Sequence, residues 1–170
     1  MFKDFAQQID QFIDWTGRVI SWFTIGMVVV MFLVVCFRFL LDIGWVWLQE
    51  LVNYQHAYIF MIGAAYTLKH DSHVRVDVFY RGMSNKNKAR VDVFGTLFLL
   101  LPVCGFIFVA SWSEVISAWQ DLEPSQRTGG LNFAYILKSV MLIMPALLSL
   151  QGIAIILKKA PLLFNKSESS

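Results

Sequence analysis

Four long apolar stretches, separated by shorter polar segments, dominate the chain. They cover about residues 19–41, 45–68, 91–112 and 133–157. Roughly 20 helical residues cross a hydrocarbon core of about 30 Å, and unpaired backbone groups are too costly in lipid for an irregular crossing. The pattern therefore predicts an all-α integral membrane protein with four transmembrane helices, built as a single membrane domain over residues 1–170.

A shorter pattern precedes the first stretch. Polar residues there alternate at helical spacing with an apolar face formed by Phe2, Phe5, Ile9, Phe12 and Ile13. An amphipathic helix of low overall hydrophobicity lies in the plane of the membrane interface. We therefore expect residues 2–16 to form a separate interfacial helix on the cytoplasmic side, before the chain turns into the bilayer.

The basic residues are distributed unevenly between the segments that flank the apolar stretches. Of the 14 Lys and Arg, all except Arg38, Arg127 and Lys138 lie in the N-terminal segment, the loop 69–90 or the tail 158–170. Cytoplasmic segments of membrane proteins carry an excess of Lys and Arg. Both termini and the basic loop 69–90 are therefore predicted to be cytoplasmic, with a flexible tail over residues 158–170.

The composition excludes several classes of protein. Apolar residues make up 57% of the chain and charged residues 15%, against roughly 45–50% and about 25% in soluble domains. These values do not fit a soluble enzyme, and a net charge of +2 is too small for a nucleic-acid-binding surface. Cys36 and Cys104 lie inside apolar stretches without the spacing of a redox or zinc site. We expect no catalysis and no cofactor.

The second apolar stretch is polar in its first half. Polar side chains inside a span are costly and mark candidate functional sites; here they are Gln49, Glu50, Asn53, Gln55 and His56. Helical spacing places Gln49, Asn53 and His56 on one face, with Glu50 at its edge. Either this face contacts another helix or another subunit, or its polar groups find their partners within the chain, for example through an ion pair between Glu50 and Lys138. A transport pathway inside this chain is less favoured, because Glu50 lies far from the membrane midplane.

The basic loop contains residue types that bind metals, namely His70, Asp71, His73 and Asp77. A His-x-x-His pair without a further Cys or His is a weak signal, so we expect no metal site. A basic loop beneath a bilayer typically contacts anionic membrane lipid. We expect His73, Arg75 and Asp77 to make contacts along the cytoplasmic membrane face.

Several short motifs occur in a characteristic order and spacing. The most distinctive is His73-Val74-Arg75-Val76-Asp77, which follows a span containing Gly63-Ala64-Ala65. The others are Arg38, Trp47 with Glu50-Leu51, Leu68-Lys69, Ser111-Trp112, Gly129-Gly130-Leu131, Lys138 and Gln151-Gly152. In these features the chain resembles, from about Phe12 to Leu157, the small membrane subunit of tripartite ATP-independent periplasmic (TRAP) transporters.

The resemblance implies a function within a larger assembly. Such a subunit pairs with a much larger membrane subunit, which carries the substrate and the sodium ions that drive uptake. A periplasmic binding protein delivers an organic acid, such as a dicarboxylate, a sialic acid or a 2-oxo acid. The small subunit is then a scaffold for the transport subunit and helps to dock the binding protein, in the inner membrane of a bacterial or archaeal cell.

On this interpretation the second stretch supplies most of the partner interface. The residues expected there are Trp47, Gln49, Glu50, Asn53 and His56, together with Lys138 from the fourth stretch. Many members of the family have two consecutive acids where this chain has Gln49-Glu50, and a basic residue often stands at the position of Asn53. Hydrogen bonds are therefore expected to replace a strongly charged contact.

A protein without such partners is the alternative hypothesis. The chain would then be a stand-alone four-helix structural or regulatory membrane protein, which binds anionic lipid through Lys86, Lys88 and Arg90 of the basic loop. Neither hypothesis involves nucleic acid or makes the chain an enzyme.

Overall fold

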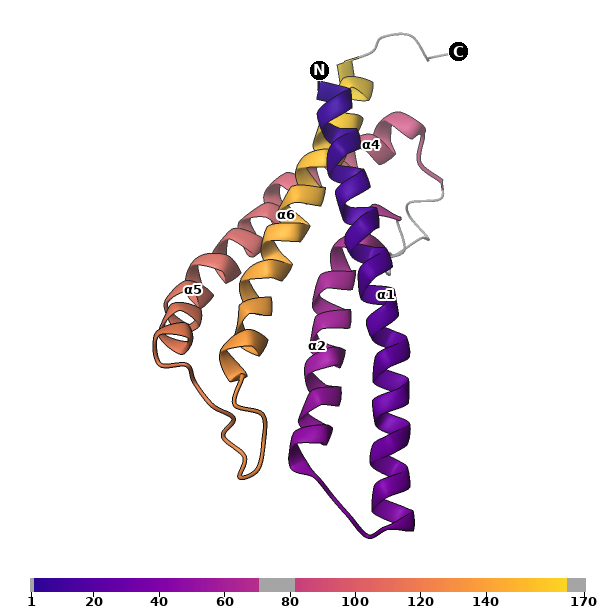
Figure 1. Cartoon of the computed structure of the whole chain (residues 1–170). Helices are drawn as coiled ribbons and strands as arrows, with labels where there is room; N and C mark the ends of the chain where they lie inside the picture. The colour runs from indigo at the N-terminus through magenta and orange to yellow at the C-terminus, as the bar shows by residue number, and fades with distance from the viewer. Residues whose placement is uncertain (1, 71–81, 165–170) are drawn as a thin grey trace.

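Helices make up all of the regular structure that the computed structural model describes, which covers residues 2–70 and 82–164. They are α1 (Phe2–Leu40), α2 (Val46–Lys69), α4 (Asn85–Gly95), the π-helix η1 (Thr96–Leu100), α5 (Leu101–Gln120) and α6 (Ala134–Phe164). Because α4, η1 and α5 follow one another without a gap, the described chain forms four helical rods (Figure 1). The predicted all-helical fold class is confirmed.

The rods lie in the order α5, α6, α2 and α1 (Figure 1). Rods that are consecutive in the chain run in opposite directions, so α2 and α6 run the same way. Helix α6 contacts α1, α2, α4, η1 and α5, and α1 also packs along α2. The start of α1 and the end of α6 lie together at what we call the termini end of the bundle. The connections 41–45 and 121–133 lie at the opposite end, called the loop end.

Three helical segments are long and apolar enough to cross a membrane: Asp4–Leu40, Lys86–Gln120 and Ala134–Pro161. The 24 residues of α2 would span about 36 Å at 1.5 Å per residue. Its polar first half, however, lowers its hydropathy, and α2 is not among the three segments. The four spans predicted from the sequence are therefore confirmed only in part.

The N-terminal segment is not a separate helix, in contrast to the prediction for residues 2–16. It is continuous with the first span in the 39 residues of α1. Its buried side chains Ala6, Ile9 and Ile13 form the core of the bundle with Ala65 of α2 and Ala154 of α6. Part of the predicted apolar face thus packs against neighbouring helices of the same chain, and the helix continues from it into the first span without a break.

Part of the predicted apolar face of this segment stays outside the core. Phe5 is 52% exposed and Phe12 is 46% exposed. Ala6, which was not assigned to the apolar face, is fully buried beside Ile9 and Ile13, and a small side chain there allows a close approach of the helices. The hydrophobic periodicity therefore predicted the helix and the burial of Ile9 and Ile13 correctly, but not the exposure of Phe5 and Phe12.

A local widening of the helix precedes Pro102. The amide of Leu101 donates to the carbonyl of Thr96, five residues back, as is characteristic of a π-helix. A proline ring inside an α-helix collides with the carbonyl four residues back, here that of Phe98. The wider turn of η1 accommodates this ring, in agreement with the usual occurrence of single π-turns at irregular points of long helices.

Helix α6 continues to Phe164, past residue 157, where the sequence pattern placed the end of the fourth span. Two ion pairs explain the extension. Lys158 pairs with Asp10 of α1, and Lys159 Nζ lies 2.5 Å from Asp92 Oδ2 of α4. These contacts hold the last turns of α6 against the rest of the bundle at the termini end.

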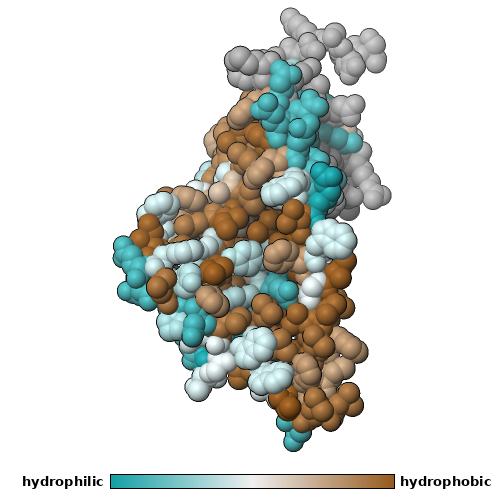
Figure 2. Space-filling model, viewed as in Figure 1, coloured by the Kyte–Doolittle hydropathy of each residue, from teal (hydrophilic) through white to brown (hydrophobic). Residues whose placement is uncertain are grey.

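The surface of the bundle is strongly apolar. Figure 2 shows brown, hydrophobic residues along the helices and a teal, hydrophilic cluster near the termini end. Large side chains are widely exposed, among them Phe39 at 80%, Phe60 at 73% and Phe106 at 74%. Exposed apolar surface on this scale marks contact with lipid or with another protein.

Candidate functional site

The side chain of Glu50, in the first turns of α2, is only 6% exposed. Its Oε1 accepts a hydrogen bond of 2.5 Å from the Ser125 hydroxyl, and its Oε2 accepts one of 2.7 Å from the Leu131 amide. Both donors belong to the loop 121–133, which connects α5 to α6. Glu50 therefore fastens this loop to α2 at the loop end of the bundle.

The backbone of the loop is shaped to receive this carboxylate. Ser125 donates through its amide to the Leu131 carbonyl at 3.1 Å, and Gly129 has a positive φ of 77° that glycine adopts without strain. A Cβ atom at Gly130 would lie 2.5 Å from both Glu50 Oε2 and Ser125 Oγ. A side chain at position 130 would thus displace the loop from Glu50, which explains the two consecutive glycines.

Lys138 pairs with acids other than Glu50. Its Nζ lies 2.7 Å from Glu114 Oε1 of α5 and 2.5 Å from Glu123 Oε2 of the loop. The prediction of an ion pair between Glu50 and Lys138 is therefore wrong. Each of the two side chains finds its polar partners within the chain, but the partners are different.

The other residues predicted for the partner interface leave a face of α2 uncovered. Trp47 is 41% exposed, Asn53 and His56 are also exposed, and Gln49 is half-buried. The ring of His56 lies 5.5 Å from the ring of Phe60, centroid to centroid. We call Asn53, His56 and Phe60 the open α2 face. Of the residues predicted for the cytoplasmic loop, His73, Arg75 and Asp77 lie outside the described part of the chain.

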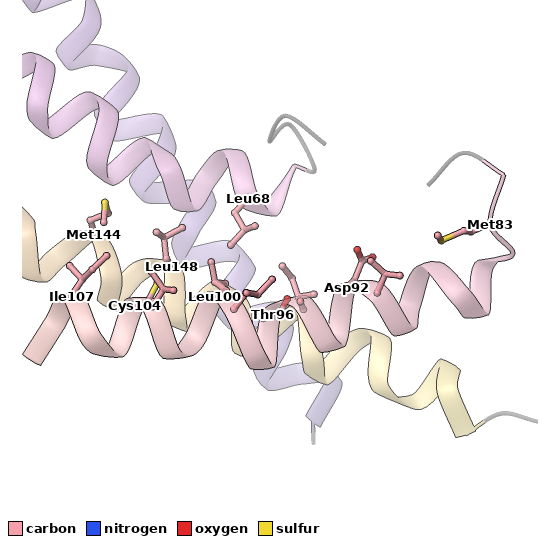
Figure 3. Close-up of a pocket in the computed structure, with 14 residues that line it drawn as sticks. Leu68, Met83, Asp92, Thr96, Leu100, Cys104, Ile107, Met144 and Leu148 are labelled. Carbon is pink, nitrogen blue, oxygen red and sulfur yellow. The ribbon is translucent and has the colours of Figure 1, made fainter. Parts of the chain in front are cut away.

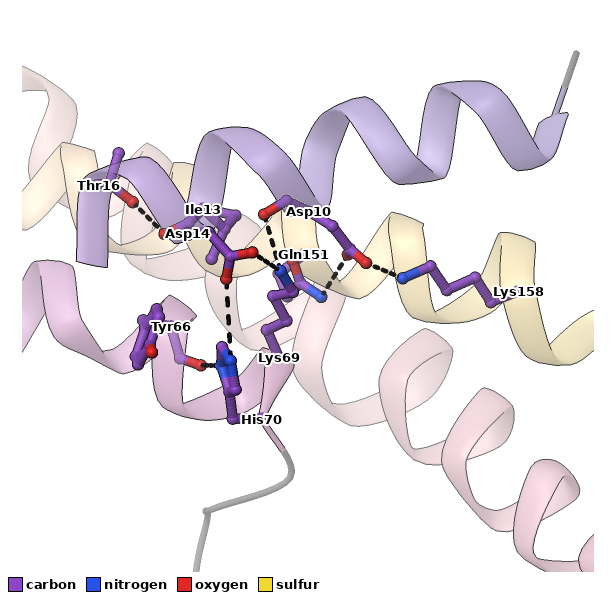
Figure 4. Close-up of polar contacts among 9 residues, drawn as sticks. All are labelled: Asp10, Ile13, Asp14, Thr16, Tyr66, Lys69, His70, Gln151 and Lys158. Carbon is purple, nitrogen blue, oxygen red and sulfur yellow. Dashed lines mark hydrogen bonds and ion pairs between the residues drawn. The ribbon is translucent and has the colours of Figure 1, made fainter. Parts of the chain in front are cut away.

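A polar network at the termini end joins α1, α2 and α6 (Figure 4). Lys69 pairs with Asp14 and donates to the Asp10 carbonyl at 2.9 Å. The Asp10 carboxylate accepts from Gln151 Nε2 at 3.4 Å and pairs with Lys158. The sequence pattern had placed Asp10 and Asp14 on a solvated face, and only their spacing of four residues in a helix indicated that they share partners.

A cavity of about 720 Å³ lies beside η1 and is lined by residues of α2, α4, η1, α5 and α6. Figure 3 shows Leu68, Leu100, Ile107 and Leu148 among the side chains around it. Its wall is apolar apart from a few groups, of which Asp92 already pairs with Lys159. Such a wall accommodates hydrocarbon better than a polar substrate.

No group of three or more His, Cys, Asp or Glu within residues 2–70 and 82–164 is arranged to hold a metal ion.

Comparison with protein families then identifies the chain. The family model for tripartite ATP-independent periplasmic transporters, DctQ component, matches residues 27–161. The chain belongs to this family. Neither the curated proteins nor the solved structures gave a match.

Membership of the DctQ family confirms the resemblance seen in the sequence. The family is a transporter component and not an enzyme, and it works with the large TRAP membrane subunit, DctM, and a periplasmic binding protein. Together with the apolar helices, it indicates a multi-pass protein of the inner membrane. The alternative of a stand-alone regulatory protein is not supported.

The family match includes the contacts at the loop end of this DctQ component. Glu50, the loop 121–133 and Lys138 all lie within residues 27–161. The side chains of Glu50 and Lys138 are bound inside the chain, so these motif residues hold the subunit's own fold. Asp10 and Asp14 of the termini-end network precede the matched region.

Proposed function

We propose that this DctQ component is a scaffold with four transmembrane spans for the large subunit of a sodium-driven organic-acid transporter. The observation that carries the proposal is the open α2 face, where Asn53 and His56 are exposed beside Phe60, which is 73% exposed. An amide and an imidazole are costly against lipid within a span. A second membrane subunit packed on this face would cover them.

The course of the chain supports α2 as the fourth span. Helix α1 and the rod formed by α4, η1 and α5 run in the same direction, and α2 returns between them (Figure 1). Both α1 and Lys86–Gln120 are segments that can cross a membrane. If both cross in the same sense, the segment between them must cross back. This places both termini on one side, which the basic residues make the cytoplasmic side.

Two sets of contacts support the role as a rigid scaffold. At the termini end, Asp10 connects α1 to Lys69 of α2 and to Lys158 of α6. At the loop end, Glu50 connects α2 to the loop between α5 and α6. A carrier whose transport subunit moves through the membrane needs a partner that keeps its shape, and helices fastened at both ends supply it.

The loop end would face the periplasm in this orientation. The loop 121–133 is therefore the segment in reach of a periplasmic binding protein, and we include its docking in the proposed function. Substrate and sodium would be bound by the large subunit, so this chain itself would need no cofactor. The substrate class, an organic acid, rests on the family resemblance.

Co-purification with the large subunit tests the scaffold role. The two genes are expressed together, the small subunit carries the affinity tag, and the double variant Asn53→Leu/His56→Leu is compared with wild type. We expect the variant to insert into the membrane and to retain less of the large subunit. Ser113→Leu, a polar-to-leucine change at an exposed position of α5, is the matched control. Equal retention by all three proteins would refute the role of the open α2 face.

Transport is measured separately. The complex in liposomes, with the binding protein outside, is tested for uptake of a panel of carboxylates with and without an inward sodium gradient. Uptake that needs all three components and the gradient supports the proposal. Uptake by the large subunit and binding protein alone, at an undiminished rate, would refute a scaffold function for this chain.

A further inference from the structure

A groove with two arginines lies between α1 and α2 at the loop end. It has a volume of about 540 Å³. Its lining consists of Met31, Val34, Val35, Arg38 and Phe39 of α1, Gln49, Val52 and Asn53 of α2, and Arg127 of the loop. We call it the arginine groove. Arg38 and Arg127 are far apart in the sequence, and only the fold brings them to one site.

The arginine groove collects the positive charge of the loop end. Arg38, Arg127 and Lys138 are the basic residues that the sequence places on this side of the membrane. Lys138 is neutralised by Glu114 and Glu123. The two remaining cations, Arg38 and Arg127, both line the groove and are both exposed.

Neither guanidinium group is neutralised by an ion pair with an acid in the described part of the chain. Glu50 acts electrostatically on Arg127. Its two carboxylate oxygens, however, already accept hydrogen bonds from Ser125 and Leu131. Glu50 thus offsets part of the charge of Arg127 but forms no ion pair with it. The guanidinium groups of Arg38 and Arg127 therefore keep the capacity to bind an anion at the level where a span ends.

The walls of the groove indicate what kind of anion it receives. A guanidinium group binds carboxylate or phosphate through paired hydrogen bonds. Gln49 and Asn53 add amide groups to the wall, and Asn53 also belongs to the open α2 face. Amides need hydrogen-bonding partners, which a protein segment offers and an acyl chain does not. The groove and the open α2 face thus form one continuous surface suited to a protein.

We propose that the arginine groove receives an acidic side chain of the large membrane subunit, with Arg38 and Arg127 binding its carboxylate. This inference rests on the proposed function, because it requires that the large subunit packs on the open α2 face. It adds a charged contact at the periplasmic end of that interface. The acid is supplied by the partner, whereas the acid of this chain, Glu50, serves its own loop.

Charge-removing variants test the inference in the assembled transporter. Arg38→Gln, Arg127→Gln and the double variant are each expressed with the large subunit, and the dissociation constant of the two subunits is measured in lipid nanodiscs. Loss of one partner of a desolvated charge pair weakens binding by roughly tenfold or more. We expect about that loss for each single variant. Lys86→Gln, which removes an exposed charge at the termini end, should bind as wild type does.

A second pair of variants keeps the charge. Arg38→Lys and Arg127→Lys retain the topology signals but lose the fork geometry, so we expect weaker binding than wild type and tighter binding than the Gln variants. We expect Arg38→Glu to abolish binding to the large subunit. Binding should return when one acidic residue at the periplasmic end of the large subunit is changed to Lys. That rescue identifies the partner carboxylate and is independent of the stability of any single variant.

The outcomes separate this inference from the proposed function. If wild-type subunits fail to associate, the proposed function fails. If they associate and every arginine variant binds as tightly as wild type, the arginine groove has no role in assembly and the inference is overturned. The isolated subunit is also titrated with phosphatidylglycerol vesicles. Arginine-dependent lipid binding with unchanged subunit affinity would assign the groove to a lipid headgroup and overturn the inference as well.

Discussion

The aromatic ring of Tyr66 in α2 occupies the space where a side chain at Gly17 of α1 would lie. A Cβ atom at position 17 would be 2.6 Å from Cγ of the ring and 2.8 Å from its Cε2. The same ring packs against His70, with centroids 4.2 Å apart. Tyr66 is thus held from both sides, and the close approach of α1 and α2 depends on a glycine.

Gly17→Ala should destabilise the bundle. The added methyl group must displace Tyr66, and overpacking of this kind costs about 1–3 kcal/mol, offset in part by the roughly 1 kcal/mol that alanine gains over glycine in a helix. Thermal unfolding of the purified subunit in detergent measures the change. Gly105→Ala in α5 is the matched control, because no atom lies within 4 Å of its added Cβ. A lower melting temperature for Gly105→Ala than for Gly17→Ala would contradict this account.

Asp10→Ala should loosen the end of α6. The Asp10 carboxylate accepts from Gln151, which is 2% exposed, and it pairs with Lys158. Its removal leaves a buried amide without its acceptor, at a cost of about 1–3 kcal/mol. Hydrogen exchange of the α6 amides should therefore be faster in the variant. Gln11→Ala changes an exposed residue of the same turn and should leave the exchange pattern as it is in wild type.

Most of the helices could be predicted from the sequence because long apolar runs are needed to cross lipid, however the helices pack; α2 is the exception to this pattern, since polar residues interrupt its first half. The face of α1 that packs could not be predicted in the same way. Phe5 and Ile9 are equally apolar, but Ile9 is 5% exposed and Phe5 is 52% exposed. The difference depends on the small Ala65 and Ala154 that other helices bring to this point.

The sequence indicated which polar residues matter, but it did not indicate which groups they bind. Glu50 was a candidate because an acid in a span is costly, and the structure shows it fully hydrogen-bonded. Its donors are a hydroxyl and a backbone amide about 80 residues away, neither of which has a charge that the sequence pattern could match to it. Asp10 and Lys158 are 148 positions apart, so only the antiparallel return of α6 brings them together.

Trp47→Ala should weaken assembly and leave insertion intact. Trp47 is 41% exposed, and its ring lies 6.1 Å from that of Trp45, centroid to centroid. Aromatic anchors at an interface contribute disproportionately to binding, commonly about 2 kcal/mol or more. The quantity measured is the large subunit retained per small subunit in a pull-down. Trp112→Ala in α5, a tryptophan that is 50% exposed, is the control. An equal loss for both would show that the effect is general to interfacial tryptophans.

Glu50→Ala should free the loop 121–133 while the helices stay folded. The Ser125 hydroxyl and the Leu131 amide lose their acceptor, and a hydrogen bond to a charged group contributes about 1.5–3 kcal/mol. The amides of Ser125 and Leu131 should then exchange faster with solvent. Gly130→Ala should have the same effect with the carboxylate present, because its Cβ would lie 2.5 Å from Glu50 Oε2. Gln126→Ala, at an exposed position of the same loop, should leave exchange unchanged.

The two loop variants also separate the two roles considered for Glu50. If the carboxylate acts through the loop, Glu50→Ala and Gly130→Ala should reduce uptake by the assembled transporter to a similar extent. If it contacts the large subunit directly, Gly130→Ala should release the loop without the loss of assembly seen for Glu50→Ala. The burial of Glu50, with both oxygens engaged inside the chain, leads us to expect the first result. Uptake by Gly130→Ala at the wild-type rate, with its loop exchanging rapidly, would contradict it.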